Sequence, residues 1–468
     1  MLVDVSEDGW HEAEATCELM DGLPLALDQA AAYIEENQCS FADYLRLYQT
    51  RRTALLKRRS ALSKRDYPKS VATTWSLSFE QVERADSVAA DLLRLCAFLH
   101  PDAIAETMIL EGAAELGPVL QSLADDPIRL EEVIGELRKY SPVQRNSETK
   151  TLTIHRLVQT VLKDAMSREI QRAWAEQTVR VVSKAFPDPE DVGRWPICEQ
   201  YLPHMRACAE LIEQWNMTFA EAAQLLHRAG AYLYQRGQYT EAELPLQRAL
   251  AIREQALGRD HPDIATSLYN LAFLSRDQGK HEQAKLLFQH ALEIRQQVFG
   301  PNHPNVAECL NNLAWLYYAQ GKYEQAESFY QRGLVIYERV LGPNNHYVGD
   351  SLNGLALLYG AQSKYEQAEP LMQRSLVLFE QVFGSSHPNV AVCLNNLARL
   401  YAWQGKYKQA EPLIQRALAI REQSLGPKHP SLAATLEGYA ELLRKIGREG
   451  EAVPLEERAK AIRANLTA

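Results

Sequence analysis

The chain lacks the sequence features of a membrane protein, a secreted protein or a nucleic-acid binder. No apolar run approaches the roughly 20 residues that a membrane helix needs, and the start of the chain has neither the basic beginning nor the apolar middle of a signal peptide. The formal net charge is −10, whereas contact with nucleic-acid phosphates needs a basic surface. We therefore expect a cytoplasmic protein that binds neither membranes nor nucleic acids.

Cysteine is scarce and shows no pairing pattern. The 7 cysteines are odd in number, scattered along the chain and never spaced as C-x-x-C. Disulfide frameworks and structural zinc sites both depend on such pairs. We expect reduced thiols in the core and no metal site.

The sequence motifs of several common enzyme classes are missing as well. No stretch reads G-x-x-x-x-G-K-[ST], the glycine loop that cradles phosphates, and no run of parallel-strand patterns could carry such a loop. A nucleophile elbow and an HExxH motif are also absent. The sequence therefore predicts that this chain is not an enzyme and holds no cofactor on its own.

What the chain does have is a six-residue phrase that recurs with a fixed period along its last half. The phrase begins as GQYTEA at Gly237 and returns every 42 residues as GKHEQA, GKYEQA, SKYEQA, GKYKQA and GREGEA, the last at Gly447. Units of equal length without insertions stack in register. The pattern predicts an α-solenoid.

The third unit shows why each repeat should form a helical hairpin. A first helix is predicted over 306–320, and Gly321 ends it because glycine adopts the left-handed cap at little cost. A second helix is predicted over 323–341, ending at Gly342. Alanines at matching places should let the paired helices approach closely. They are Ala272, Ala314, Ala356 and Ala398 on the first helices and Ala242, Ala284, Ala326, Ala368, Ala410 and Ala452 on the second.

Histidines occupy the connectors between units, one in each, next to a proline that opens the following helix. A metal site is one interpretation, but a spacing of one repeat separates the rings, so a turn-and-cap role fits better. The fourth connector departs, with His346 where proline is expected. The cap histidines are His261, His303, His387 and His429.

The repeats resemble the tetratricopeptide repeat (TPR), and their 42-residue form with a GPxHP connector is similar to the repeats of kinesin light chain and bacterial relatives. The resemblance covers about residues 224–461. It implies a right-handed superhelix of helix-turn-helix units whose first helices line a concave groove that binds a protein or peptide. The groove residues that it implies are Tyr269, Asn270, Phe273, Arg276, Asn311, Asn312, Trp315, Tyr318, Asn353, Asn395, Asn396, Arg399 and Trp403, with Glu308, Asp350, Glu437, Glu441, Arg444 and Lys445 beside them.

Asparagines beside aromatic rings suit an extended peptide, because an amide donates to and accepts from a backbone while rings bury side chains. Under this interpretation Asn312 supports no core contact. The alternative is that the rings of Phe273, Trp315 and Trp403 pack between repeats.

The rest of the chain divides into smaller helical parts. We expect a helical subdomain over 1–66, a winged-helix domain over 67–167 with a hairpin at 141–155 and a helix at 156–166, a helical coupling segment over 168–222, and six repeats over 223–468, the last of them a cap. Ser40 and Asp43 form a capping pair that opens one helix. The basic run over 51–65 is interpreted as a solvated helix end, with a nucleic-acid patch as the alternative.

Two short motifs in this part resemble those of NB-ARC signalling ATPases of the STAND class. GLPLA at 22–26 resembles their proline motif, and TIHRLVQ at 153–159 resembles their MHD motif, with isoleucine in the first place and arginine in the third. The resemblance implies that Pro24 packs on adenine and that His155 reaches the diphosphate of bound ADP. A helix-opening proline and a structural histidine are the alternatives.

The missing glycine loop places the ATPase core outside this chain. We expect the chain to begin inside the helical subdomain that follows such a core, so ADP or ATP with magnesium would bind only where that core is present. The leading hypothesis is the sensor part of a STAND signal-transduction protein, whose other partner is its own nucleotide-binding core. The alternative is a nucleotide-independent TPR scaffold or adaptor.

Overall fold

The computed structural model describes residues 30–31, 34, 39–40, 42–48, 71–139, 143–427 and 429–467. The chain divides into two compact units, Met1–Leu225 and Leu226–Ala468. Each unit is described by itself. Pro24 and the basic run over 51–65 lie outside the described residues.

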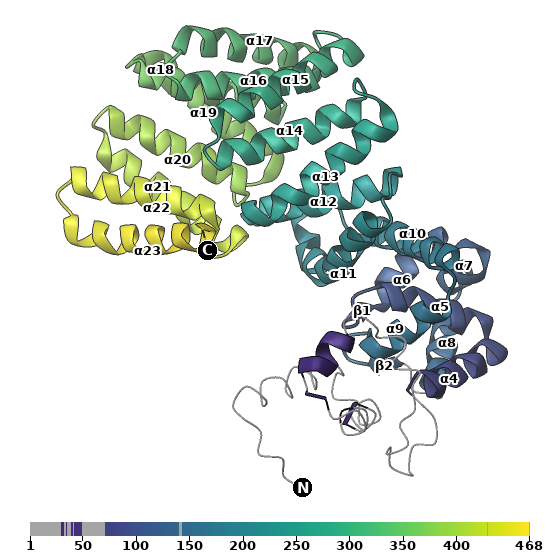
Figure 1. Ribbon diagram of the computed structural model, residues 1–468. Coiled ribbons are helices and arrows are strands. Elements are labelled where there is room, and N and C mark those ends of the chain that lie inside the picture. Colours follow the sequence, from purple (N-terminus) through teal and green to yellow (C-terminus); the bar gives the residue numbers. More distant parts are fainter. Residues whose placement is uncertain are drawn as a thin grey trace. The chain divides into compact units, whose positions relative to one another are not determined.

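The first unit is mainly helical and holds one small sheet (Figure 1). Its elements are α4 (Val71–Ala85), α5 (Ser87–Phe98), β1 (Ile104–Ala105), α6 (Glu106–Gly112), η1 (Ala113–Leu116), α7 (Gly117–Asp125), α8 (Pro127–Lys139), β2 (Val143–Asn146), β3 (Thr151–Ile154), α9 (Arg156–Ala165), α10 (Arg168–Ala185), η2 (Val192–Arg194) and α11 (Trp195–Gln214).

The sheet confirms the predicted hairpin and adds a strand to it. β2 pairs antiparallel with β3, Val143 lying opposite Ile154, and α9 follows directly. β1 pairs on the other side of β3, which gives the order β1-β3-β2. The sequence pattern missed β1 because two residues are too few to show a strand period.

The predicted capping pair near the start of the chain is confirmed. Residues 42–48 are helical. The Ser40 hydroxyl donates to Asp43 Oδ2 at 2.8 Å and accepts the Asp43 backbone N–H at 3.1 Å. The two side chains therefore satisfy groups that the first turn leaves open.

The second unit is a stack of helical hairpins (Figure 1). Its helices are α12 (Ala220–Gln235), which begins at the end of the first unit, α13 (Tyr239–Leu257), α14 (Pro262–Asp277), α15 (His281–Phe299), α16 (Pro304–Ala319), α17 (Tyr323–Leu341), α18 (His346–Ala361), α19 (Tyr365–Phe383), α20 (Pro388–Trp403), α21 (Tyr407–Leu425), α22 (Pro430–Lys445) and α23 (Glu449–Thr467). The α-solenoid predicted from the period is confirmed.

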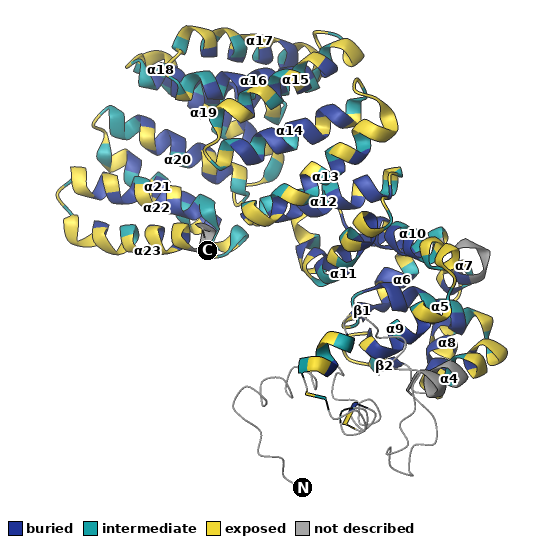
Figure 2. Ribbon diagram, in the orientation of Figure 1, coloured by how far each residue is buried: buried dark blue, intermediate teal, exposed yellow. Residues whose placement is uncertain are grey.

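Small side chains hold the hairpins together. All ten predicted packing alanines are buried, and the buried residues form a stripe along the facing sides of paired helices (Figure 2). The turns use the left-handed conformation as expected, with φ of +72° at Gly321 and +87° at Gly342. Ser363 stands at the place of Gly321 in the next unit and adopts a φ of +60°, which is unfavourable for a residue with a Cβ.

The connector histidines cap helices, as the turn-and-cap interpretation predicted. The Nδ1 atoms of His261, His303, His387 and His429 accept the backbone N–H two residues later, at 3.1 to 3.2 Å. In the departing connector the cap is Asn345, whose Oδ1 accepts from the Tyr347 N–H at 3.0 Å. Each connector therefore supplies one acceptor to the start of the next helix.

The described cysteines form no disulfide, and five of the six are buried, Cys39 being partly exposed. Burial raises the pKa of the Cys96 thiol to about 12, which keeps it protonated and unreactive. Within the described ranges no helix is long and apolar enough to cross a bilayer. No group of three or more potential metal ligands occurs among the same residues.

Candidate functional site

The concave side of the stack encloses a cavity of about 670 Å³. First helices of five consecutive hairpins line it, and residues of the second helices α17 and α21 reach its floor. The lining consists of Tyr269, Phe273, Arg276, Glu308, Asn311, Asn312, Trp315, Tyr330, Tyr337, Tyr347, Asp350, Asn353, Gly354, Leu357, Val392, Asn396, Arg399, Arg421, Ser431 and Ala434.

Nine of the thirteen predicted groove residues line this cavity. They are Tyr269, Phe273, Arg276, Asn311, Asn312, Trp315, Asn353, Asn396 and Arg399, joined by the predicted acids Glu308 and Asp350. Asn270, Tyr318 and Arg444 are not among its lining residues or those of the hollow described next.

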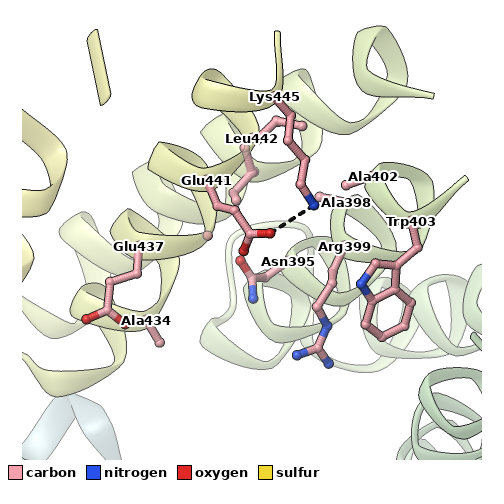
Figure 3. Close-up of a pocket in the computed structure, with 12 residues that line it drawn as sticks. Asn395, Ala398, Arg399, Ala402, Trp403, Ala434, Glu437, Glu441, Leu442 and Lys445 are labelled. Atoms are coloured by element: carbon pink, nitrogen blue, oxygen red, sulfur yellow. Dashed lines mark ion pairs between the residues drawn. The ribbon is translucent and has the colours of Figure 1, made fainter. Parts of the chain in front are cut away.

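A second hollow of about 310 Å³ lies between α20 and α22. Asn395 and Trp403 line it, and Arg399 borders both this hollow and the large cavity. Figure 3 shows Glu441 pointing towards Lys445, with which it forms an ion pair of 2.9 Å. The hollow is thus lined by this ion pair of the last repeat and by Trp403 of the repeat before it.

The inward asparagines form hydrogen bonds within the stack. The expectation that Asn312 supports no core contact was therefore wrong. Asn312 Nδ2 donates to the Tyr269 hydroxyl at 2.8 Å and to the Glu308 carbonyl at 2.9 Å. Its Oδ1 accepts from Arg276 at 3.3 Å. Because Tyr269 and Arg276 belong to α14, the amide of Asn312 joins two neighbouring repeats.

The same linkage recurs along the concave face. Asn396 Nδ2 donates to Asn353 Oδ1 at 3.1 Å, and Asn311 Nδ2 donates to Ser351 Oγ at 2.7 Å. Asn270 lies 3.2 Å from His227 Nε2. Sequence spacing placed these amides on one face, but their partners come from the adjacent repeat and depend on the curvature of the stack.

The aromatic residues fulfil both interpretations that the sequence left open. Phe273 and Trp315 pack against a core cluster of α14 to α16 and also line the cavity. The Arg276 guanidinium lies over both rings, 4.4 Å from the centre of Phe273 and 5.2 Å from that of Trp315. Packing between repeats and exposure to the groove are therefore not exclusive.

Charges of both signs face the cavity. Arg295 holds Glu308 in an ion pair of 2.7 Å, whereas Asp350 forms no ion pair with a described residue. Asp350 keeps contact with solvent, but the protein that surrounds it and the charge of Glu308 raise its pKa to about 7. Burial lowers the pKa of the Arg421 guanidinium to about 10.

Sequence reasoning missed the tyrosines on the cavity floor. The resemblance placed the groove on the first helices, yet Tyr330 and Tyr337 of the second helix α17 also reach the cavity. Gly354 makes room for Tyr330, because a Cβ there would lie 2.3 Å from its Cε1 atom. The sequence held one indication of this space: Gly354 stands at the place that asparagine occupies at 270, 312 and 396 in other units.

The superhelix returns far enough for the sixth hairpin to touch the first. His429 Nε2 lies 2.8 Å from the Gln235 carbonyl oxygen, although the two residues are 194 positions apart. A Cβ on Gly237 would lie 2.3 Å from Cδ of Pro430. The first and last hairpins are therefore in contact.

His155, which the NB-ARC resemblance assigns to a nucleotide, is the N-cap of α9. Its Nδ1 accepts the Leu157 N–H at 3.1 Å. Since Nδ1 is used by the cap, only Nε2 could contact a phosphate. The nucleotide role of His155 stays a prediction, and that of Pro24 falls outside the described residues.

The family model described as tetratricopeptide repeat matches five overlapping segments, 221–297, 263–339, 319–376, 347–402 and 394–465. The chain belongs to the tetratricopeptide repeat family. Its repeat region is a protein-interaction fold. A second model, described as a domain of unknown function (DUF7779), matches residues 80–171, which include the hairpin and α9.

One curated protein is similar to part of the chain. A nucleotide-binding leucine-rich repeat (NLR)-like protein of Hyaloscypha variabilis is 31% identical over 260 residues, covering 53% of this chain and 25% of its own length. The chain spans about a quarter of that relative's length.

Two solved structures resemble the chain. One shows nearly identical TPR-like repeats assigned to a kinesin light chain of Podosopora anserina, at 24% identity, covering 44% of this chain and 99% of that one with a TM-score of 0.35. The other is NprR in complex with its cognate peptide NprX, at 18% identity, covering 73% and 87% with a TM-score of 0.48.

Proposed function

We propose that the TPR stack is the sensor part of a STAND-type signal-transduction protein and binds a protein or peptide in the concave cavity. The observation that carries the proposal is the cavity of about 670 Å³, lined by amides, rings and charges from five consecutive hairpins. Such a surface offers hydrogen bonds to an extended backbone and apolar contact to its side chains. The proposed setting is the cytoplasm.

The binding half of the proposal is tested by blocking the cavity. Val392 lines the cavity and is 40% exposed, and Val377 of α19 is 49% exposed and absent from that lining. The variants Val392→Trp and Val377→Trp add the same volume at two exposed valines. Peptides are first selected from a randomised hexapeptide library on the unaltered chain.

Val392→Trp should then weaken the selected peptides by about tenfold or more, because its ring fills part of the cavity. Val377→Trp should bind them as the unaltered chain does, and both variants should melt at similar temperatures. Equal binding by the two variants would locate recognition outside the cavity. Selection of no peptide at all would count against the binding half of the proposal.

The second half of the proposal couples the repeats to a nucleotide-dependent switch whose phosphate-binding loop is not in this chain. We expect this chain alone to hold ADP no tighter than the millimolar range, because His155 and Pro24 would supply only a lid. Isothermal titration measures this directly. Micromolar binding would reveal a phosphate site within this chain.

In the complete protein, His155 is proposed to stabilise the resting state by contacting the diphosphate. His155→Ala removes both the ring and the α9 cap, whereas His155→Asn removes the ring and leaves an oxygen that can cap. Both variants should lose bound ADP and signal without ligand, since a few kcal/mol decide such an equilibrium. If His155→Asn retains ADP and stays silent, the nucleotide assignment is wrong.

A further inference from the structure

The proposed binding cavity is lined by Asp350, an acid without the arginine partner that Glu308 has in the preceding unit. In the unit before it, Arg295 of α15 donates to Glu308 of α16 at 2.7 Å and to the Asn305 carbonyl at 2.8 Å. One period of 42 residues later, Asp350 takes the place of Glu308 and Tyr337 takes the place of Arg295. The acid is kept, but the guanidinium that neutralised it is replaced by a phenol.

The residues at the places of Tyr337 and Asp350 differ in the other units. Phe379 and Val392 occupy the two places in the following unit, so both charges are absent there. Only the unit of Asp350 has a carboxyl at the second place without an arginine at the first. No described arginine pairs with Asp350 instead. Arg276 pairs with Asp277 at 2.8 Å and Arg295 with Glu308. Arg399 and Arg421, which also line the cavity, donate to Asn396 Oδ1 at 3.3 Å and to the Ser431 carbonyl at 2.7 Å.

Two largely buried tyrosines reach the cavity that Asp350 lines. Tyr330 and Tyr337 are 4% and 2% exposed, and both line the cavity with Asp350. Neither hydroxyl forms a hydrogen bond with a described residue, although the hydroxyl of a buried tyrosine usually has a hydrogen-bond partner. The two hydroxyls and the Asp350 carboxyl are therefore three polar groups that a ligand in the cavity can contact.

The surroundings favour a cation as that partner. Burial raises the pKa of both phenols, and the nearby charge of Asp350 adds to the rise in each. The ring of Tyr347 stacks on that of Tyr337, with centres 5.2 Å apart. A carboxyl beside stacked aromatic rings attracts a positive group both by charge and by the ring faces.

We propose that Asp350, Tyr330 and Tyr337 form a subsite for a basic side chain, lysine or arginine, of the protein or peptide held in the cavity. This inference rests on the proposed function. The ligand's cation takes the place that Arg295 fills beside Glu308, so the subsite selects for a basic residue at one position of the ligand.

The test uses the full chain and a library of N-acetylated, C-amidated hexapeptides with every position randomised. The variants are Asp350→Asn, which keeps the shape and removes the charge, and Glu366→Gln, which neutralises an exposed acid of α19 outside the cavity. The unaltered chain and Glu366→Gln should enrich lysine or arginine at one position. Asp350→Asn should lose that enrichment.

A selected peptide then carries citrulline or norleucine in place of its basic residue. The neutral peptide should bind the unaltered chain about tenfold or more weakly, and Asp350→Asn should bind both peptides alike. Tyr337→Arg restores the internal cation and should also abolish the preference in a chain that still melts cooperatively.

The outcomes separate this inference from the function on which it rests. Selected peptides without a basic preference, or an equal loss from the neutral peptide on the unaltered chain and Asp350→Asn, would overturn the subsite and leave the binding cavity in place. If no hexapeptide is retained by any variant, the proposed binding function fails and the subsite fails with it.

Discussion

Replacing Asn312 by alanine should destabilise the repeat stack whether or not a ligand is present. The substitution removes the bonds from Nδ2 to the Tyr269 hydroxyl at 2.8 Å and to the Glu308 carbonyl at 2.9 Å, and the weaker contact with Arg276 at 3.3 Å. Each bond contributes about 0.5–1.5 kcal/mol net, so the two short bonds give about 1–3 kcal/mol. Tyr269 is 7% exposed, and its unpaired hydroxyl moves the cost towards the upper value.

The assay is urea and thermal unfolding followed by circular dichroism. If the second unit, Leu226–Ala468, unfolds cooperatively, the expected loss of stability lowers its melting temperature by roughly 2–12 °C. A double-mutant cycle with Tyr269→Phe isolates the hydrogen bond, because phenylalanine keeps the ring and removes the acceptor. The two changes should be less than additive.

Unfolding of Asn312→Ala at the same urea concentration as the unaltered chain, or an effect that adds fully to that of Tyr269→Phe, would refute the linking role of the amide. The result also governs binding experiments. A loss of ligand affinity in Asn312→Ala must be measured well below its melting temperature, since the amide holds two repeats together as well as facing the cavity.

Three further predictions concern other positions of the stack. Ser363→Gly should stabilise it by about 0.5–1 kcal/mol, because serine there has a φ of +60°, and Gly321→Ser, at +72° with open space around it, should cost a similar amount in chemical denaturation. Ala314→Leu should cost about 1–3 kcal/mol by overpacking a fully buried position, and unfolding like that of the unaltered chain would contradict the packing of the hairpin. Asp350 has a folded pKa of about 7 against an ordinary value of 3.8, so the folded state binds its proton more tightly and loses stability as pH rises from about 4 to 7. Asp350→Asn should therefore raise the melting temperature more at pH 8 than at pH 5, and an equal change at both would refute the shift.

The periodic sequence determined the architecture of the repeats. The recurring phrase, the packing alanines and the turn glycines each have a local cause, namely helix spacing, close approach and left-handed backbone. For the same reason the capping histidines could be identified, since the cap of His303 forms with a residue only two positions later. The hairpin before α9 was also visible, because alternation and a polar turn are local patterns.

The tertiary structure decided which inward residues are engaged and which remain open. Asn312 faces the concave side as its spacing predicted, but its partner Tyr269 lies 43 positions away and meets it only when the stack curves. Tyr337 and Asp350 form part of one cavity for the same reason. A sequence period fixes the face on which a side chain lies, whereas the distance to a side chain of the next repeat depends on how the hairpins pack.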